Sequence, residues 1–110
     1  MSFKLGFLEE ALKEWSKLDN GVRAQFKSKL AERLETPRVP SAQLRGHKDR
    51  YKIKLRGLGY RLVYEVRDRE LIVVAVAVGK RNRSIVYKIA AMRQRDRDQP
   101  PPAPHTGQPA

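Results

Sequence analysis

The sequence predicts an α+β domain in which an N-terminal strand and a helical hairpin pack on an antiparallel sheet. Apolar residues first recur at helical spacing, over about residues 8–34. They then alternate with charged residues over 51–66, as in strands covered on one face. A run rich in β-branched residues follows at 71–78. The expected order of elements is β-α-α-β-β-β-α, and a length of 110 residues suits one domain.

The N-terminal part of the chain is predicted to be mostly helical. Phe3, Leu5 and Phe7 alternate with polar or small residues, which indicates a short strand. Two amphipathic helices are expected next, with a turn at 19–21 between them and an end before Pro37. Their apolar residues recur at three- and four-residue spacing: Leu8, Ala11, Leu12, Trp15, Leu18, Val22, Phe26, Leu30 and Leu34.

Three strands are predicted over residues 51–56, 60–67 and 71–78. Short turns join them, so they are expected to be antiparallel neighbours. The last of the three is apolar on both faces, as an interior strand would be. A final helix is expected over residues 85–92, with Ser84 as its N-cap.

Composition indicates where the domain ends and which kinds of site it can contain. Residues 1–94 are expected to form the domain, and residues 95–110 a disordered, charged tail, because five of the seven prolines lie there. The sequence lacks a signal-peptide pattern and a long apolar run, so we expect a cytoplasmic protein with no membrane partner. It contains no cysteine and no spaced carboxylate cluster, so neither a metal nor a cofactor is expected.

The net charge of +12 predicts a partner that carries negative charge, such as nucleic acid, an anionic surface or an acidic protein. Nearly all of the excess lies in two blocks. Residues 45–67 contain 8 basic and 2 acidic side chains, and residues 80–98 contain 7 basic and 2 acidic ones. The two blocks flank the apolar strand, so both are expected at one cleft.

Strand alternation gathers cations on one face of the predicted sheet. Lys52, Lys54 and Arg56 lie two residues apart and so share a face, which Arg61 can join from the next strand. Cations neutralise phosphate, and aromatic rings stack on unpaired bases. The pattern predicts nucleic-acid binding, with plain solvated charge as the alternative; cleavage does not follow from it. Other residues expected at or near this cleft are Lys80, Arg81, Arg83 and Tyr87, and Glu65 is expected to pair with a neighbouring cation rather than to act as a base.

Several segments resemble the RelE toxins of type II toxin–antitoxin pairs, which belong to the RelE/ParE superfamily of bacterial toxins. The resemblance covers about residues 1–93 and excludes the tail. The segments that carry it are ALKEW at 11–15, LRG at 44–46, YKIKLR at 51–56, GYRLVY at 59–64, VGKR at 78–81 and VY at 86–87.

The resemblance implies a metal-independent endoribonuclease, an mRNA interferase that cuts messenger RNA in the ribosomal A site and inhibits translation. It implies that Lys54, with Lys52, is the general base and that Arg61 and Lys52 stabilise the phosphorane. Arg81 would assist the leaving oxygen, and Tyr87 would stack on a base. Crowding by positive charge lowers the pKa of a lysine, which permits it to act as a base. Candidate RNA or ribosome contacts are Arg45, Arg56, Lys80 and Arg83.

The resemblance also implies partners. These are a RelB-like antitoxin, the ribosomal A site with its mRNA and 16S rRNA, and operator DNA reached only through the antitoxin complex. Two alternatives stay open: a ParE-like inhibitor of DNA gyrase, which shares the fold, and a non-catalytic RNA-binding module.

Overall fold

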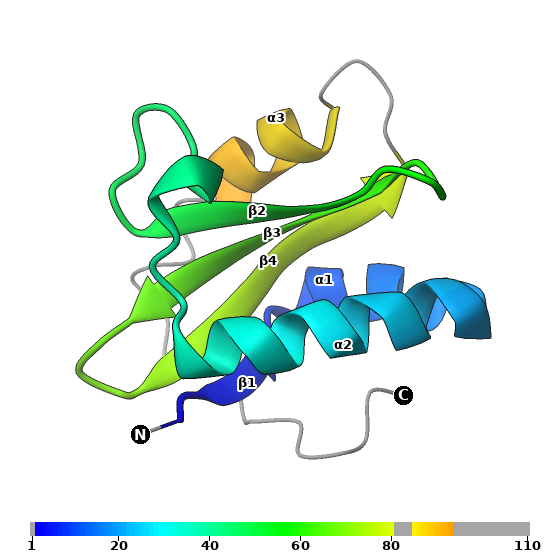
Figure 1. Ribbon diagram of the computed structural model, residues 1–110. Helices are drawn as coiled ribbons and strands as arrows, with labels where there is room; N and C mark the ends of the chain where they lie inside the picture. Colours follow the sequence, from blue (N-terminus) through cyan, green and yellow to red (C-terminus); the bar gives the residue numbers. More distant parts are fainter. Residues whose placement is uncertain (1, 81–84, 94–110) are drawn as a thin grey trace.

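The computed structural model describes residues 2–80 and 85–93, and shows helices on both faces of a four-stranded sheet (Figure 1). The strands are β1 (Lys4–Phe7), β2 (Arg50–Leu55), β3 (Tyr60–Arg67) and β4 (Ile72–Lys80). The helices are α1 (Glu9–Ser16), α2 (Asn20–Glu35) and α3 (Ile85–Met92), and a short 3₁₀ turn, η1, spans Pro40–Ala42. The order β-α-α-β-β-β-α confirms the predicted fold class.

The sheet combines an antiparallel meander with one parallel edge strand. Its order is β1-β4-β3-β2, with β2–β3 and β3–β4 antiparallel, as predicted from their short connections. β1 pairs in parallel with β4, a geometry that requires the long intervening crossover. β4 therefore lies in the interior of the sheet, in agreement with its apolar sequence.

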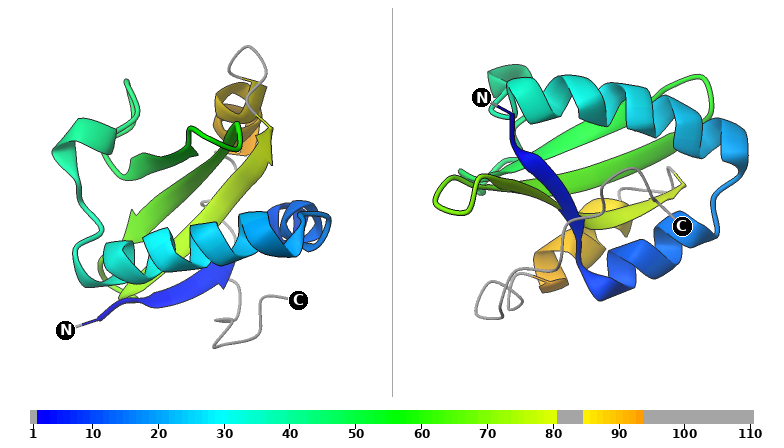
Figure 2. Two further views of the ribbon diagram at one scale, coloured as in Figure 1. Left: turned by 45° about the vertical axis from the view of Figure 1, so that its right-hand side comes forward. Right: turned by 90° about the horizontal axis from the view of Figure 1, so that it is seen from below.

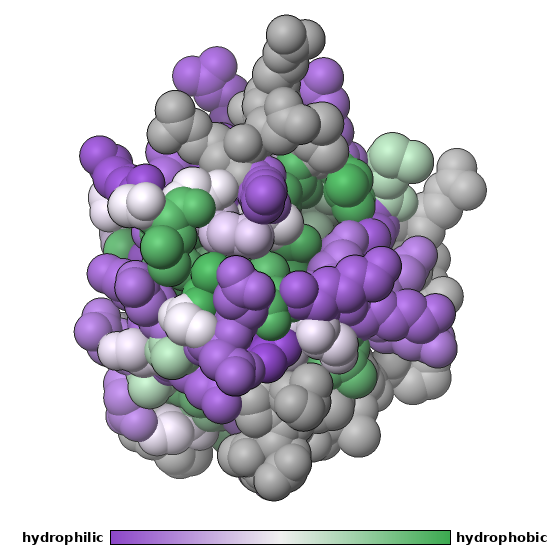
Figure 3. All heavy atoms as spheres, turned by 90° about the vertical axis from the view of Figure 1, so that its right-hand side faces the viewer, coloured by the Kyte–Doolittle hydropathy of each residue, from purple (hydrophilic) through white to green (hydrophobic). Residues whose placement is uncertain are grey.

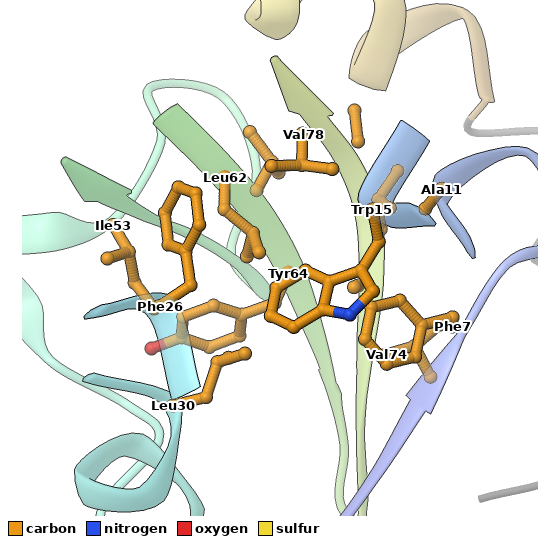
Figure 4. Packing of buried hydrophobic residues seen from close by; sticks show 14 of the residues in the cluster. Phe7, Ala11, Trp15, Phe26, Leu30, Ile53, Leu62, Tyr64, Val74 and Val78 are labelled. Carbon is orange, nitrogen blue, oxygen red and sulfur yellow. The ribbon is translucent and has the colours of Figure 1, made fainter. Parts of the chain in front are cut away.

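Two helices cover one face of the sheet and α3 covers the other. Figures 1 and 2 show α1 and α2 on the same side, with α3 across the sheet from α2. The larger core lies beneath α1 and α2 (Figure 4). There, fully buried Trp15 has its ring centroid 5.2 Å from that of Phe7 and 6.1 Å from that of Phe26. The strand residues on this face are mostly apolar, so the charged residues of β2 and β3 lie mainly on the face that carries α3.

Several predicted boundaries were wrong by one or two residues; the interior strand, for example, was expected to end at residue 78 but continues to Lys80. Leu71 was expected to begin the interior strand, but it is exposed and has a φ of +54°, and β4 begins at Ile72. The backbone N–H of Leu71 donates to the carbonyl of Asp68 at 3.2 Å, so Leu71 belongs to the tight β3–β4 turn. Asn20 was placed in the turn between the helices, but it begins α2.

The predicted cap residue Ser84 and the predicted tail at 95–110 lie outside the described residues. Within residues 2–80 and 85–93, none of the helices has the length and apolar character needed to cross a membrane.

Candidate active site

Antiparallel pairing of β2 with β3 brings the predicted cations together. Lys54 lies directly opposite Arg61, and Lys52 lies opposite Val63. Between the two lysines, Ile53 points into the core beneath α2 (Figure 4), so the lysines face the opposite side of the sheet, where α3 lies. Lys52, Lys54 and Arg61 are all half-buried. Their charges therefore act in a partly desolvated setting, where an electrostatic interaction is stronger than in water.

The hairpin between β2 and β3 completes a hollow beside this pair. A positive φ of +73° at Gly59, which glycine adopts without strain, turns the chain back toward β3. Arg56 follows the last residue of β2 and is exposed in the turn, so it lies beyond the strand in which it was expected. The hollow measures about 230 Å³ and is lined by Lys54, Leu55, Arg56, Gly59, Tyr60 and Arg61.

Tyr87 reaches this site from α3. The guanidinium carbon of Arg61 lies 5.1 Å from the centroid of the Tyr87 ring, within the range of a cation–π contact. Two buried atoms here, Arg61 Nε and Tyr87 Oη, have no hydrogen-bond partner among the residues that the structure describes. Buried polar atoms are usually paired, so these two mark a place where a polar ligand group can bind.

Burial at this contact raises the pKa of the Tyr87 phenol, and the positive charge of Arg61 opposes the rise. An Arg61→Met substitution removes the charge that favours the phenolate, so we expect it to raise the pKa of Tyr87 further. Titration of phenolate absorbance, with a Tyr87→Phe variant to identify the Tyr87 signal, measures the change. An unchanged or lower pKa would contradict the contact.

A second hollow lies beside Tyr87, between α3 and the loop that precedes β2. It measures about 310 Å³ and is lined by Leu44, Arg45, His47, Tyr87, Lys88 and Ala91. Arg45 is exposed in this loop. Arg61 lines the first hollow and Tyr87 the second, so the contact between these two side chains connects the linings of the two hollows.

The remaining predicted cations lie at the end of β4. Lys80 is the exposed last residue of that strand and lies opposite Tyr60, so it shares the hairpin end of the sheet with Arg61. Arg81 and Arg83 lie outside the described residues, and their roles stay predictions. The hairpin end is on the right in Figure 1, and Figure 3 views that side: hydrophilic side chains surround a smaller apolar centre.

One buried cation on the α3 face was not singled out from the sequence. Arg50 is 3% exposed and its Nε lies 3.0 Å from Oε1 of Glu65, its cross-strand partner. Oε2 of Glu65 lies 2.8 Å from Nε of Arg67. The expectation that Glu65 pairs with a neighbouring cation is thus confirmed. Strand alternation places Arg50 on the same face as Lys52, which was the available signal, but its charge suggested exposure.

Comparison with known proteins agrees with this architecture. The family model described as ParE toxin of type II toxin–antitoxin system, parDE, matches residues 5–85. The mRNA interferase toxin RelE of Escherichia coli K12 is 55% identical over 93 residues, which cover 84% of this chain and 98% of RelE.

Two solved structures are similar over most of their length. A mutant of the E. coli toxin RelE in the free state has a TM-score of 0.79 and 52% identity, and covers 86% of this chain and 99% of its own. The same mutant in complex with a peptide of the antitoxin RelBc has a TM-score of 0.73 and 53% identity, and covers 82% and 95%. The chain therefore belongs to the RelE toxins, within the RelE/ParE superfamily of type II toxin–antitoxin systems.

Proposed function

We propose that this protein is the toxin of a type II toxin–antitoxin pair and an mRNA interferase, an endoribonuclease that cuts mRNA in the ribosomal A site and inhibits translation. The observation that carries the proposal is the cross-strand pair of Lys54 and Arg61, with the Tyr87 ring packed on the guanidinium. The 55% identity to a protein named mRNA interferase toxin RelE supports it. Partly buried cations beside an aromatic ring suit a phosphodiester whose flanking bases are unpaired.

In the proposed reaction, the 2′-hydroxyl of the RNA attacks the adjacent phosphorus and forms a dianionic phosphorane. Lys54, assisted by Lys52, accepts the proton of that hydroxyl. Arg61 and Lys52 stabilise the charge that develops on the phosphorane oxygens. The bond to the 5′-oxygen then breaks, and the departing oxygen takes a proton from water, which leaves a cyclic phosphate on one fragment and a 5′-hydroxyl on the other. Arg81 assists the departing oxygen, mainly by electrostatics, because arginine scarcely deprotonates.

The other predicted residues bind and orient the RNA. Tyr87 stacks on a base next to the reacting phosphate. The further contacts to mRNA or 16S rRNA are proposed for Arg45, Arg56, Lys80 and Arg83. Side chains supply every step, so the proposed reaction requires no metal. Since a lysine base and arginine electrostatics make a weakly equipped site, the ribosome has to position the RNA.

We also propose a RelB-like antitoxin as the cognate partner, acting in the cytoplasm on a toxin domain formed by residues 1–94. The complex of E. coli RelE with a RelBc peptide supports this proposal. An acidic segment of the antitoxin would complement the basic blocks at 45–67 and 80–98. Operator DNA would be bound through the complex.

The test is primer extension on a defined mRNA in a purified translation system, with and without ribosomes. We expect cuts within the A-site codon that depend on ribosomes, and only feeble cutting of free RNA. Equal cutting of free RNA would contradict the ribosome dependence. Uncut mRNA with blocked translation would favour the RNA-binding module. Uncut mRNA with normal translation would favour the gyrase inhibitor, which a DNA supercoiling assay then tests.

A further inference from the structure

A buried ion pair that takes no part in the proposed reaction lies beneath α3. In the described part of the chain, Arg50 and Glu65 are the only buried charged residues, with 3% and 4% of their surfaces exposed. A buried ion pair is poor evidence for stability, because well-packed apolar residues of similar size often replace it without loss. The pair therefore calls for an explanation in terms of geometry.

Arg50 joins the sheet to α3 with two separate nitrogens. Its Nε donates to Oε1 of Glu65 on β3, and its Nη1 donates to the backbone carbonyl of Ala90 in α3. A guanidinium is planar and rigid, so hydrogen bonds from two of its nitrogens fix both the position and the orientation of the group. Glu65 thus orients the arginine, and the arginine fixes the backbone of the helix.

α3 depends on such contacts for its placement. It has eight residues, fewer than an isolated helix needs to be stable in water. Val86 and Ala90 are buried on the sheet. Beyond its end, Arg93 donates to Oε2 of Glu14 at 2.9 Å and to the carbonyl of Val76 at 2.8 Å. Arg50 supplies the polar contact nearer the middle of the helix.

Ala90 lies three residues after Tyr87, so the two occupy neighbouring positions on one side of the helix. The contact of Tyr87 with Arg61 depends on the same helix position that the bond from Arg50 to Ala90 fixes. A misplacement of about 1 Å, arising far from the reacting atoms, can slow an enzyme about 100-fold. The site is therefore sensitive to a residue that does not line it.

We propose that Arg50, oriented by Glu65, is a positioning residue that fixes α3 on the sheet and thereby keeps the Tyr87 ring against Arg61. The catalytic consequence rests on the proposed ribosome-dependent cleavage. The anchoring of α3 does not, so the two can be tested separately.

The test compares Arg50→Met with Arg67→Met in the full chain. Each substitution removes one of the two arginines that pair with Glu65 and leaves the other, so both variants lose the same charge. Only Arg50→Met removes the bond to Ala90. We expect amide hydrogen exchange in α3 to become about tenfold faster, or more, in Arg50→Met than in Arg67→Met, with β3 and β4 alike in both.

Cleavage on programmed ribosomes provides the second measurement. The kcat of Arg50→Met is expected to fall about 10- to 100-fold relative to Arg67→Met, with KM changed less than about threefold. Arg50→Lys is expected to behave like Arg50→Met, because a single ammonium nitrogen lacks the planar set of donors that binds Glu65 and Ala90 at the same time. If Arg50→Met does not fold, Arg50→Lys decides the question.

Equal rates of amide hydrogen exchange in α3 of Arg50→Met and Arg67→Met would overturn the proposal. Faster exchange with unchanged kcat would also overturn it, because α3 would then be anchored without positioning the site. A wild-type protein that leaves ribosome-bound mRNA uncut would instead contradict the proposed function, while the exchange data would still decide whether Arg50 anchors the helix.

Discussion

Replacing Arg61 with methionine is expected to lower the rate of cleavage of ribosome-bound mRNA by about 100- to 1000-fold, the usual cost of removing one group that stabilises transition-state charge. Arg61 is half-buried, lies opposite Lys54 and packs on Tyr87, so its charge is fixed in place before the RNA binds. Methionine keeps much of the volume and removes the charge. Single-turnover cleavage at saturating toxin measures the effect.

The matched control for this substitution is Arg69→Met. Arg69 is exposed in the turn between β3 and β4, at the opposite end of β3 from Arg61. A strand of eight residues spans about 26 Å, well beyond the screening length of about 8 Å at physiological salt. Cleavage by Arg69→Met should therefore stay within about twofold of wild type. Equal losses in both variants would show that net charge, and not the position of Arg61, determines the rate.

Trp15→Ala is expected to lower the free energy of unfolding by about 3–5 kcal/mol. The indole is fully buried and packs against the rings of Phe7 and Phe26, so alanine would leave a cavity in the larger core. A domain of this size has a total stability of about 5–15 kcal/mol, so the loss is a large part of the whole.

Urea unfolding followed by far-ultraviolet circular dichroism measures this loss, because Trp15 is the single tryptophan and the variant has no indole fluorescence. Met92→Ala serves as the control. Met92 lies in α3 with 78% of its surface exposed, and its loss should change stability by less than about 0.5 kcal/mol. A cost below about 1 kcal/mol for Trp15→Ala would mean that the core closes around the cavity.

The elements of this fold could be predicted from the sequence because each has its own hydrophobic period. The change from helical spacing to alternation near residue 50 separates the helical hairpin from the meander. The partner and direction of β1 could not be predicted in this way. An alternating pattern such as that of Phe3 to Phe7 marks a strand, but it carries no information about which strand lies beside it or in which direction.

Part of the site could also be predicted from the sequence. Alternation along β2 placed Lys52 and Lys54 on one face, since that inference needs only the geometry of a strand. The contact of Arg61 with Tyr87 depends on how α3 packs on the sheet, and no local pattern encodes that packing. The burial of Arg50 was missed for a related reason: a charged side chain suggests exposure until its partner is known.

The parallel pairing of β1 with β4 has a consequence for biosynthesis. Lys4 lies opposite Ile72 in β4, so the first strand made at the ribosome has to wait for the last of the described strands before it joins the sheet. Contacts so distant along the chain form slowly and only after most of the polypeptide has emerged. α3, which brings Tyr87, follows later still. A nascent chain therefore has no assembled cleft while β4 and α3 are still to be made.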